Sequence, residues 1–332
     1  MTLTRRSLRS RHARYTSVAV GVVALALTAT ACGGSNSAKA SSDSGASAAP
    51  SQSSAQSGSD TSAAQSAQTD FTSYTSTKSF DDTESALKKA VSDSGMMVLG
   101  DMNQAGALKS TGLNLKGAHT YFVGNPAKGK MFFQQNPAIG AEIPVRMYVW
   151  ADSDGTAHVG YFDPAAMFTA IDPKLADGGK QMAMAADKIA QGASGGKAEA
   201  GTKVDVSFVS EESTKSFSDT EKDLKKSVAS SGMMTLGDLN QAGALKATGL
   251  NLKGAHAYFV GNPAKGKMFF EQDPAIGAVI PLGMYVWADS DGTAHVGYFD
   301  PAALFTAVNS KLADGGKQMA MAAKKIADGA AK

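Results

Sequence analysis

Apolar and polar positions along this chain change their spacing several times, and each spacing predicts an element. Apolar and polar residues alternate over 204–209, which is the pattern of a strand with one buried face, and 71–77 is a weaker counterpart. The segment after 71–77 carries apolar residues at helical spacing, between a cap at Ser79 or Asp81 and a stop at Gly95. In each half of the chain, therefore, a strand is predicted to lead into a helix.

The rest of the first half continues this mixture of elements. Asn125 can cap a helix whose first position is Pro126, which is a favourable start. Ser153-Asp154-Gly155 has the composition of a hairpin turn between two strands. Strands are also predicted at 96–99, 119–123, 145–151 and 156–162, and helices at 104–110 and 175–190. Asp163-Pro164 is predicted to open a further short helix. We therefore expect an α+β fold, in which a mixed or antiparallel sheet carries helices packed on one face.

This pattern occurs twice, because the octapeptide that begins at His119 returns at His256. The same offset of 137 holds without a gap over 80–190, and roughly four positions in five are identical. Each copy is long enough for a core of its own. The sequence thus predicts two tandem copies of a two-layer domain, with these bounds: 71–193, a linker at 194–203, and 204–332. We expect the two repeats to pack against each other as a pseudo-twofold pair, since the linker is short.

The N-terminal segment has the composition of a lipoprotein signal peptide. Five arginines and no acidic residue precede an apolar run over 18–27, which is too short to span a bilayer permanently. Small residues then lead to Cys32, the single cysteine of the chain. We expect residues 1–31 to be removed and Cys32 to be acylated. The protein would then be anchored by lipid in the cell membrane, on its extracytoplasmic face. The alternative is an ordinary cleavage site followed by a free thiol.

The composition after the signal peptide argues against nucleic-acid and disulfide-linked partners. Residues 32–70 are rich in Ser and Ala with almost no large apolar residue, which predicts a disordered tether. Removing residues 1–31 leaves 27 basic against 30 acidic residues, so the net charge changes from +2 to about −3. Arg146 is then the only arginine, and no nucleic-acid partner is expected. A single, acylated cysteine leaves no thiol for an internal or inter-chain disulfide.

Several motifs keep a fixed order along both copies. In the first copy they are Gly95-Met96-Met97, the Tyr-Phe-Val-Gly-Asn-Pro strand end at 121–126, Ile143-Pro144, the hairpin at 155–161 and Asp163-Pro164. Their order and spacing resemble the bacterial domain of unknown function 302 family. The resemblance covers nearly all of both copies and implies a compact two-layer α+β domain, with no activity attached. One departure is that Asp101-Met102-Asn103 and Asp238-Leu239-Asn240 stand where the family is expected to carry an Asp-His pair.

Two groups of side chains are candidates for binding a ligand. Tyr148 and Trp150 share one face of a predicted strand, which can either line a groove or pack on the other copy. With His158 they form one candidate patch, and its counterpart is Tyr285, Trp287 and His295. The second group lies at a helix start and resembles an anion cradle, although capping alone also explains the asparagines. Its members are Asn125, Lys128, Asn262 and Lys265.

Metal sites are a further hypothesis. His119 and His256 are candidate ligands, and the many methionines are typical either of a Cu(I) site or of core filling. The run 152–155 begins like a calcium loop but lacks the glutamate that such a loop requires. We therefore predict no cofactor and keep copper as the one metal alternative.

Together these features favour a lipid-anchored binding protein that takes up a small molecule, a metal or an envelope component and catalyses no reaction. One alternative is a structural or adhesive envelope protein, which the lack of a pocket and of packing between the domains would favour. Another is an acid–base enzyme that uses Asp101 with His119 or His158. Convergence of these side chains around a deep pocket would favour the enzyme.

Overall fold

The computed structural model describes residues 66–199 and 201–332, which lie in one compact unit, Ser59–Lys332. The predicted signal peptide, Cys32 and most of the predicted tether lie outside the described residues. Among the described residues, no helix is both long enough and apolar enough to cross a membrane. The described part thus contains both copies of the duplicated domain.

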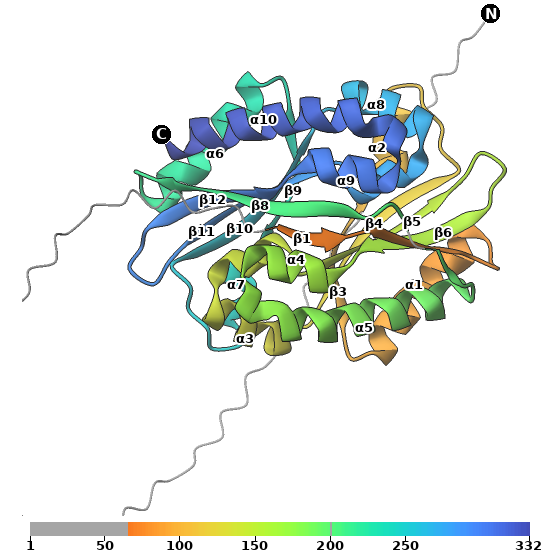
Figure 1. Cartoon of the computed structure of the whole chain (residues 1–332), viewed down its shortest axis with the longest axis horizontal. Coiled ribbons are helices and arrows are strands. Elements are labelled where there is room, and N and C mark those ends of the chain that lie inside the picture. Colours follow the sequence, from red (N-terminus) through yellow and green to blue (C-terminus); the bar gives the residue numbers. More distant parts are fainter. Residues whose placement is uncertain (1–65, 200) are drawn as a thin grey trace, which may run out of the picture. The chain divides into compact units, whose positions relative to one another are not determined.

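The first copy alternates strands and helices as its sequence pattern predicts (Figure 1). Its strands are β2 (Phe71–Thr75), β3 (Met97–Asn103), β4 (Gly117–Gly124), β5 (Val145–Ala151) and β6 (Ala157–Phe162). Its helices are α1 (Phe80–Asp93), α2 (Gln104–Lys109), α3 (Pro126–Gln135), α4 (Pro164–Ile171) and α5 (Ala176–Ser194), with the short 3-10 helices η1 (Pro137–Ala141) and η2 (Pro173–Leu175).

The second copy repeats this order. Its strands are β8 (Val204–Ser213), β9 (Met234–Asn240), β10 (Gly254–Gly261), β11 (Leu282–Ala288) and β12 (Ala294–Phe299). Its helices are α6 (Phe217–Ser230), α7 (Gln241–Lys246), α8 (Pro263–Gln272), α9 (Pro301–Val308) and α10 (Ala313–Ala331), with η3 (Pro274–Ala278) and η4 (Ser310–Leu312). The predicted α+β class and the tandem arrangement are confirmed.

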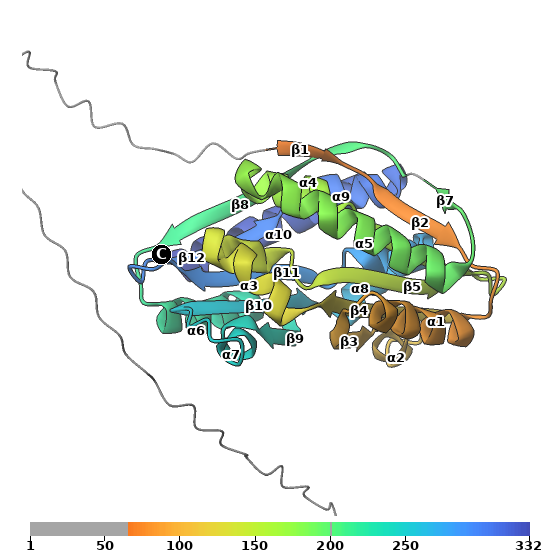
Figure 2. The ribbon, with the colours of Figure 1, turned by 90° about the horizontal axis from the view of Figure 1, so that it is seen from below.

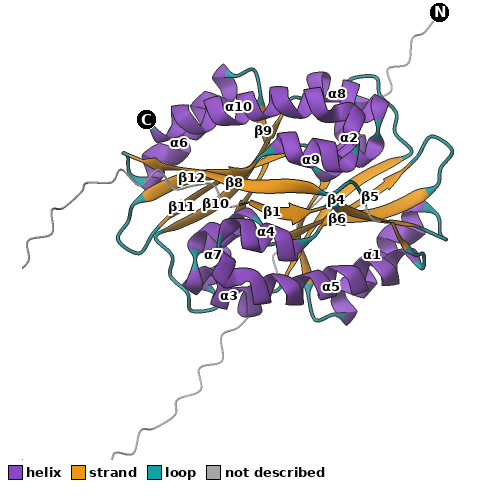
Figure 3. Ribbon diagram, viewed as in Figure 1, coloured by secondary structure: helices purple, strands orange, loops and turns teal. Residues whose placement is uncertain are grey.

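Each copy contributes five strands to a six-stranded sheet, and all strand pairs are antiparallel. The orders are β3-β4-β5-β6-β2-β7 and β1-β8-β12-β11-β10-β9. One face of each sheet is covered by two long helices, α1 with α5 and α6 with α10 (Figure 3). Leu87 and Val91 of α1 are buried there because their helical spacing places both on the side that meets the strands.

Two short strands at the ends of the predicted domains differ from expectation. β1 (Ser66–Thr69) lies within the range assigned to the tether, yet it pairs with β8, a strand of the second copy. β7 (Ala198–Glu199) lies within the predicted linker and pairs with β2. The prediction of disorder was therefore wrong for 66–69, because backbone pairing with a distant strand orders a segment that has no apolar pattern. Figure 2 shows β1 beside β8, before the chain enters β2.

The sheet faces that carry no long helices are turned toward the other copy. Phe122 and Phe259 stack on each other with ring centroids 4.4 Å apart. The Tyr148 hydroxyl donates to the carbonyl of Pro274 at 2.9 Å, and the Tyr285 hydroxyl donates to that of Pro137 at the same distance. These reciprocal contacts relate the copies by an approximate twofold arrangement.

Candidate functional site

The second copy has an apolar pocket beside the start of α8. It has a volume of about 420 Å³ and lies between the end of β10, α8, α10 and the short helix α2 of the first copy. Its side chains are mostly aliphatic, aromatic or methionine, and those that shape it include Met233, Met268, Phe270, Ile280 and Met319. We call it the open pocket. Because α2 supplies Gln104, Ala107 and Leu108, the pocket is complete only when both copies are present.

The first copy has a counterpart at the start of α3, but it measures only about 90 Å³. Every residue that lines the open pocket has an identical residue 137 positions away, in the other copy. The same set of side chains is thus present in a wide and a narrow arrangement. Methionine side chains, with three rotatable bonds, suit a wall that adapts in this way.

The two helix starts predicted as anion cradles, at Asn125 and Asn262, lie at the edges of these pockets. Asn262 caps α8 by accepting from the backbone N–H groups of Ala264 and Lys265, and its Nδ2 donates to the carbonyl of Gly232. Asn125 likewise caps α3 and donates to Gly95, so both amide groups hold the chain itself. Lys265 brings the only charged side chain to the lining of the open pocket. The cradle is therefore a capped helix start at the edge of an apolar pocket.

The tyrosine and tryptophan rings of the aromatic patch are buried. Tyr148 and Trp150 are 0% and 5% exposed, and their rings stack with centroids 5.4 Å apart. His158 stacks on Trp150 in turn, at 5.0 Å. Tyr285, Trp287 and His295 form the same ladder in the second copy. The strand face that carries them packs against the other copy, so the sequence alternative of packing between domains is the one that the contacts match.

His119 lies between two carboxylates that come from different elements. Its Nδ1–H donates to Glu84 of α1 at 2.7 Å, and its Nε2–H donates to Asp101 of β3 at 2.8 Å. The Tyr121 hydroxyl also donates to Glu84, at 2.7 Å. The second copy repeats this cluster with Glu221, Asp238, His256 and Tyr258. Both ring nitrogens of His119 and of His256 thus lie within hydrogen-bond distance of a carboxylate.

His119 and Glu84 shift each other's pKa in the direction that favours their charged forms. Burial lowers the pKa of His119, but the hydrogen bonds and charges of Glu84 and Asp101 outweigh burial and raise it. Burial also raises the pKa of Glu84, and the hydrogen bonds from His119 and Tyr121 outweigh this and lower it. The two carboxylates therefore favour the imidazolium form of His119.

This cluster makes stability depend on pH in a direction that can be measured. A raised histidine pKa contributes stability that is complete below the unfolded value near ~6.5 and is lost as pH rises through the folded pKa. The lowered pKa of Glu84 contributes stability that is lost as pH falls through that folded value. Denaturant unfolding of the full chain should thus show lower stability at about pH 9 than at about pH 6. The double variant His119→Gln/His256→Gln should flatten this slope; an equal slope in both proteins would contradict the assignment.

His158 contacts a carboxylate, and the methionines differ widely in exposure. His158 Nε2 lies 2.9 Å from Asp152 Oδ2, and Asp154 accepts from the backbone N–H of Thr156 in the hairpin turn. Met147 is buried, whereas the following methionines are at least half exposed: Met97, Met131, Met184, Met234, Met268 and Met321. Across 66–199 and 201–332, no three His, Cys, Asp or Glu side chains are grouped to hold a metal ion. Of the two histidines that could pair with Asp101, His119 contacts it, whereas His158 contacts Asp152.

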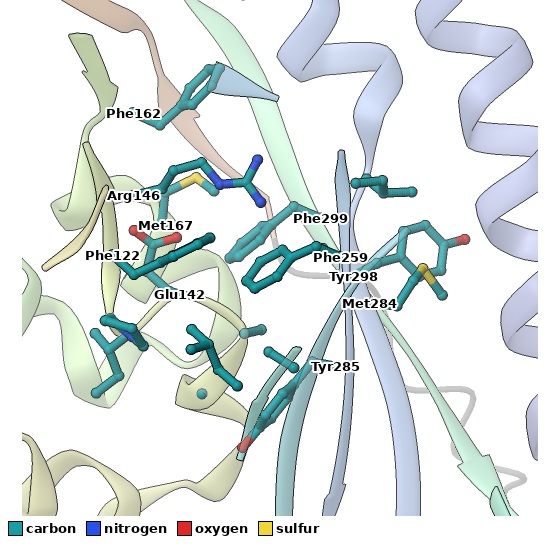
Figure 4. Close-up of a pocket in the computed structure, with 18 of the residues that line it drawn as sticks. Phe122, Glu142, Arg146, Phe162, Met167, Phe259, Met284, Tyr285, Tyr298 and Phe299 are labelled. Atoms are coloured by element: carbon teal, nitrogen blue, oxygen red, sulfur yellow. The ribbon is translucent and has the colours of Figure 1, made fainter. Parts of the chain in front are cut away.

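A further hollow, the central cavity, lies where the two copies meet. It measures about 90 Å³, and aromatic side chains of both copies line it (Figure 4). Glu142 and Arg146 bring the charged groups to its wall. Neither residue belongs to a site that the sequence patterns predict. A comparison of the two copies would have found the pair, because the equivalent residues in the second copy are Val279 and Gly283.

Comparisons with known proteins match both copies. A family model described as "Domain of unknown function DUF302" matches residues 72–192 and 209–330. A similar solved structure is the crystal structure of an uncharacterized conserved DUF302 protein from Bacillus stearothermophilus. It is 17% identical, the alignment covers 38% of this chain and 98% of that chain, and the TM-score is 0.35. A search of curated proteins found no match.

Proposed function

Because this chain belongs to the DUF302 family, whose description assigns no activity, we propose a function from the chain's own geometry: it is a non-catalytic binding protein that takes up a small, mainly apolar molecule. The observation that carries this proposal is the open pocket. Its volume of about 420 Å³ falls within the range of ~300–1,000 Å³ that is usual for small-molecule sites.

The lining favours a ligand with one anionic end. Apolar side chains make up most of the wall, and Lys265 is its one charge. Ser231 adds a hydroxyl whose Oγ is buried and, alone among the buried side-chain polar atoms of the described residues, has no hydrogen-bond partner. An apolar body with a carboxylate or sulfonate would use the walls and Lys265 together.

The arrangement of the histidines supports binding over acid–base catalysis. Asp101 and His119 are in contact, as the enzyme alternative requires. However, Glu84 occupies the other ring nitrogen, so His119 has no unpaired nitrogen with which to accept a proton from a substrate. The presence of a pocket, and of contacts between the copies, likewise favours a binding role over a purely structural one.

The proposal places this binding protein on the extracytoplasmic face of the cell membrane, anchored through Cys32. This part rests on the arginine-rich, then apolar, composition of 1–31 and on the position of Cys32. Metabolic labelling with a palmitate analogue tests it: the wild-type chain should be labelled, and Cys32→Ser should not.

The binding test uses the full chain and 1-anilinonaphthalene-8-sulfonate, an apolar fluorophore with an anionic group. We expect saturable binding of one equivalent per chain. Ala322 lines the open pocket, so Ala322→Trp fills it and should weaken binding by about tenfold or more, equivalent to ~1.4 kcal/mol.

The matched control is Ala185→Trp, at the equivalent position of the first copy, where the pocket is small. This variant should bind the fluorophore as the wild type does. The absence of saturable binding, or an equal loss in both variants, would overturn the proposal.

A further inference from the structure

The central cavity holds two charged groups that the open pocket does not use. Arg146 crosses from β5 to the second copy, where its Nη1 donates to the carbonyls of Ala278, Val279 and Pro281 at 2.9–3.1 Å. Arg146 and Glu142 are both only partly buried. Nε and Nη2 of Arg146 donate no hydrogen bond to any described residue, and the Glu142 carboxyl has no hydrogen-bond partner in that part of the chain either. One edge of the guanidinium and one carboxyl group therefore remain available at the cavity wall.

Aromatic rings fix the position of this guanidinium. Its central carbon lies 5.8 Å from the ring centroid of Phe122 and 5.4 Å from that of Phe259. Figure 4 shows Arg146 extending from the first copy toward Phe259 and Phe299 of the second. A planar guanidinium that is held in this way is preorganised to pair with a carboxylate through two parallel N–H groups.

The charge balance of the cavity favours an anion. Burial lowers the pKa of Arg146 to about 10, so the guanidinium stays charged at neutral pH. Burial raises the pKa of Glu142 well above its usual range, although the charge of Arg146 opposes this. When Glu142 is protonated, the cavity carries one net positive charge and one O–H donor.

The pair belongs to the first copy alone. Val279 and Gly283 occupy the equivalent positions in the second copy, while the residues around them are largely conserved between the copies. Gly283 lies opposite the guanidinium, and a Cβ there would sit 3.8 Å from Nη2. The pseudo-twofold interface thus accommodates one arginine and one glutamate, which makes one site per chain.

We propose that the central cavity binds one small monocarboxylate, which accepts hydrogen bonds from Arg146 and from the carboxyl group of Glu142. The cavity of about 90 Å³ has room for about six water-sized groups, which suits an acid of two to four carbons. The short apolar end of the ligand would lie against Met167 and Leu304, which also line the cavity.

Binding should be coupled to proton uptake by Glu142. The charged and titratable groups around this carboxyl are Arg146, which favours its ionised form, and Asp163, which opposes it; Tyr285 and Tyr298 also line the cavity. A bound carboxylate adds a second negative charge beside Glu142 and so strengthens its protonated form. The ligand should therefore bind more tightly as pH falls toward the ligand's own pKa.

Isothermal titration of the full chain with propionate at pH 6 and pH 8 tests this. We expect saturable one-to-one binding that is at least about fivefold tighter at pH 6. Glu142→Gln keeps a hydrogen-bond donor without a titratable proton, so it should bind propionate with little dependence on pH. Glu142→Val, which installs the residue of the second copy, should weaken binding by at least about tenfold.

Two controls separate the possible outcomes. Thermal unfolding shows whether each variant folds, and Ala322→Trp should bind propionate as the wild type does, which distinguishes this site from the open pocket. If the wild type shows no saturable binding, the cavity holds only water and the proposal is wrong. Equal affinity in Glu142→Val and the wild type would also overturn it.

Discussion

Replacing Gly277 with alanine should destabilise the protein by about 3 kcal/mol, because the added methyl group has no room. Gly277 lies in η3 and faces Tyr148 of the other copy. A Cβ at this position would lie 2.2 Å from the Tyr148 hydroxyl oxygen, closer than real contacts allow. Tyr148 would have to leave its place, and its hydrogen bond to Pro274 would be lost. Denaturant unfolding of the full chain measures this effect.

Gly266 provides the matched control. It lies inside α8, where a Cβ would meet only the Ile280 Cδ1 atom, at an ordinary 3.8 Å. Gly266→Ala should therefore be neutral or stabilise the protein by up to ~1 kcal/mol, because alanine has the higher helix propensity. Similar losses in the two variants would show that steric contact between the copies is not the cause.

Replacing Asn136 with aspartate should cost about 2 kcal/mol at neutral pH. Asn136 Nδ2 donates to Asp172 Oδ2 at 3.2 Å, and both side chains are partly buried. The substitution places two carboxylates where an amide and a carboxylate now meet. Each residue also caps a 3-10 turn through its Oδ1, a role that aspartate and asparagine fill equally well, so the loss should come from the pair alone.

The second copy shows how to reverse this loss. There the partners are exchanged, because Asn309 Nδ2 donates to Asp273 Oδ2 at 2.9 Å. The double variant Asn136→Asp/Asp172→Asn recreates that arrangement and should recover most of the stability, which a double-mutant cycle measures. If the second substitution restored nothing, the two residues would not be coupled as the hydrogen bond indicates.

Much of the local structure followed from short patterns in the sequence. The alternation at 204–209 and the cap formed by Asn125 and Pro126 each predict an element through residues that touch within a few positions. The repeat at an offset of 137 predicts that the second copy has the same fold, because similar sequences pack similar cores. The element predictions succeed because strands and caps depend on interactions between residues close in sequence. The prediction for the second copy succeeds because its sequence repeats that of the first.

The candidate sites depended on contacts between distant segments. Glu84, Asp101 and His119 come from a helix and two strands, and no spacing along the chain shows that they meet. The exposure of Tyr148 depended on which sheet face meets the other copy. Strand β1 has no apolar pattern, and distant segments hold it: it pairs with β8 and packs against α4.

The open pocket and its counterpart in the first copy show most directly which features follow from sequence and which from tertiary structure. Their lining residues are identical in sequence, yet one pocket measures about 420 Å³ and the other about 90 Å³. The sequence by itself determined most of the elements, the duplication and the chemical character of these walls. Only the tertiary structure decided which side chains face the other copy, where Glu142 and Arg146 meet a cavity, and which pocket is open. The physical reason is that burial and cavity shape depend on the packing of segments far apart in the chain, whereas strands, turns and caps depend on neighbours.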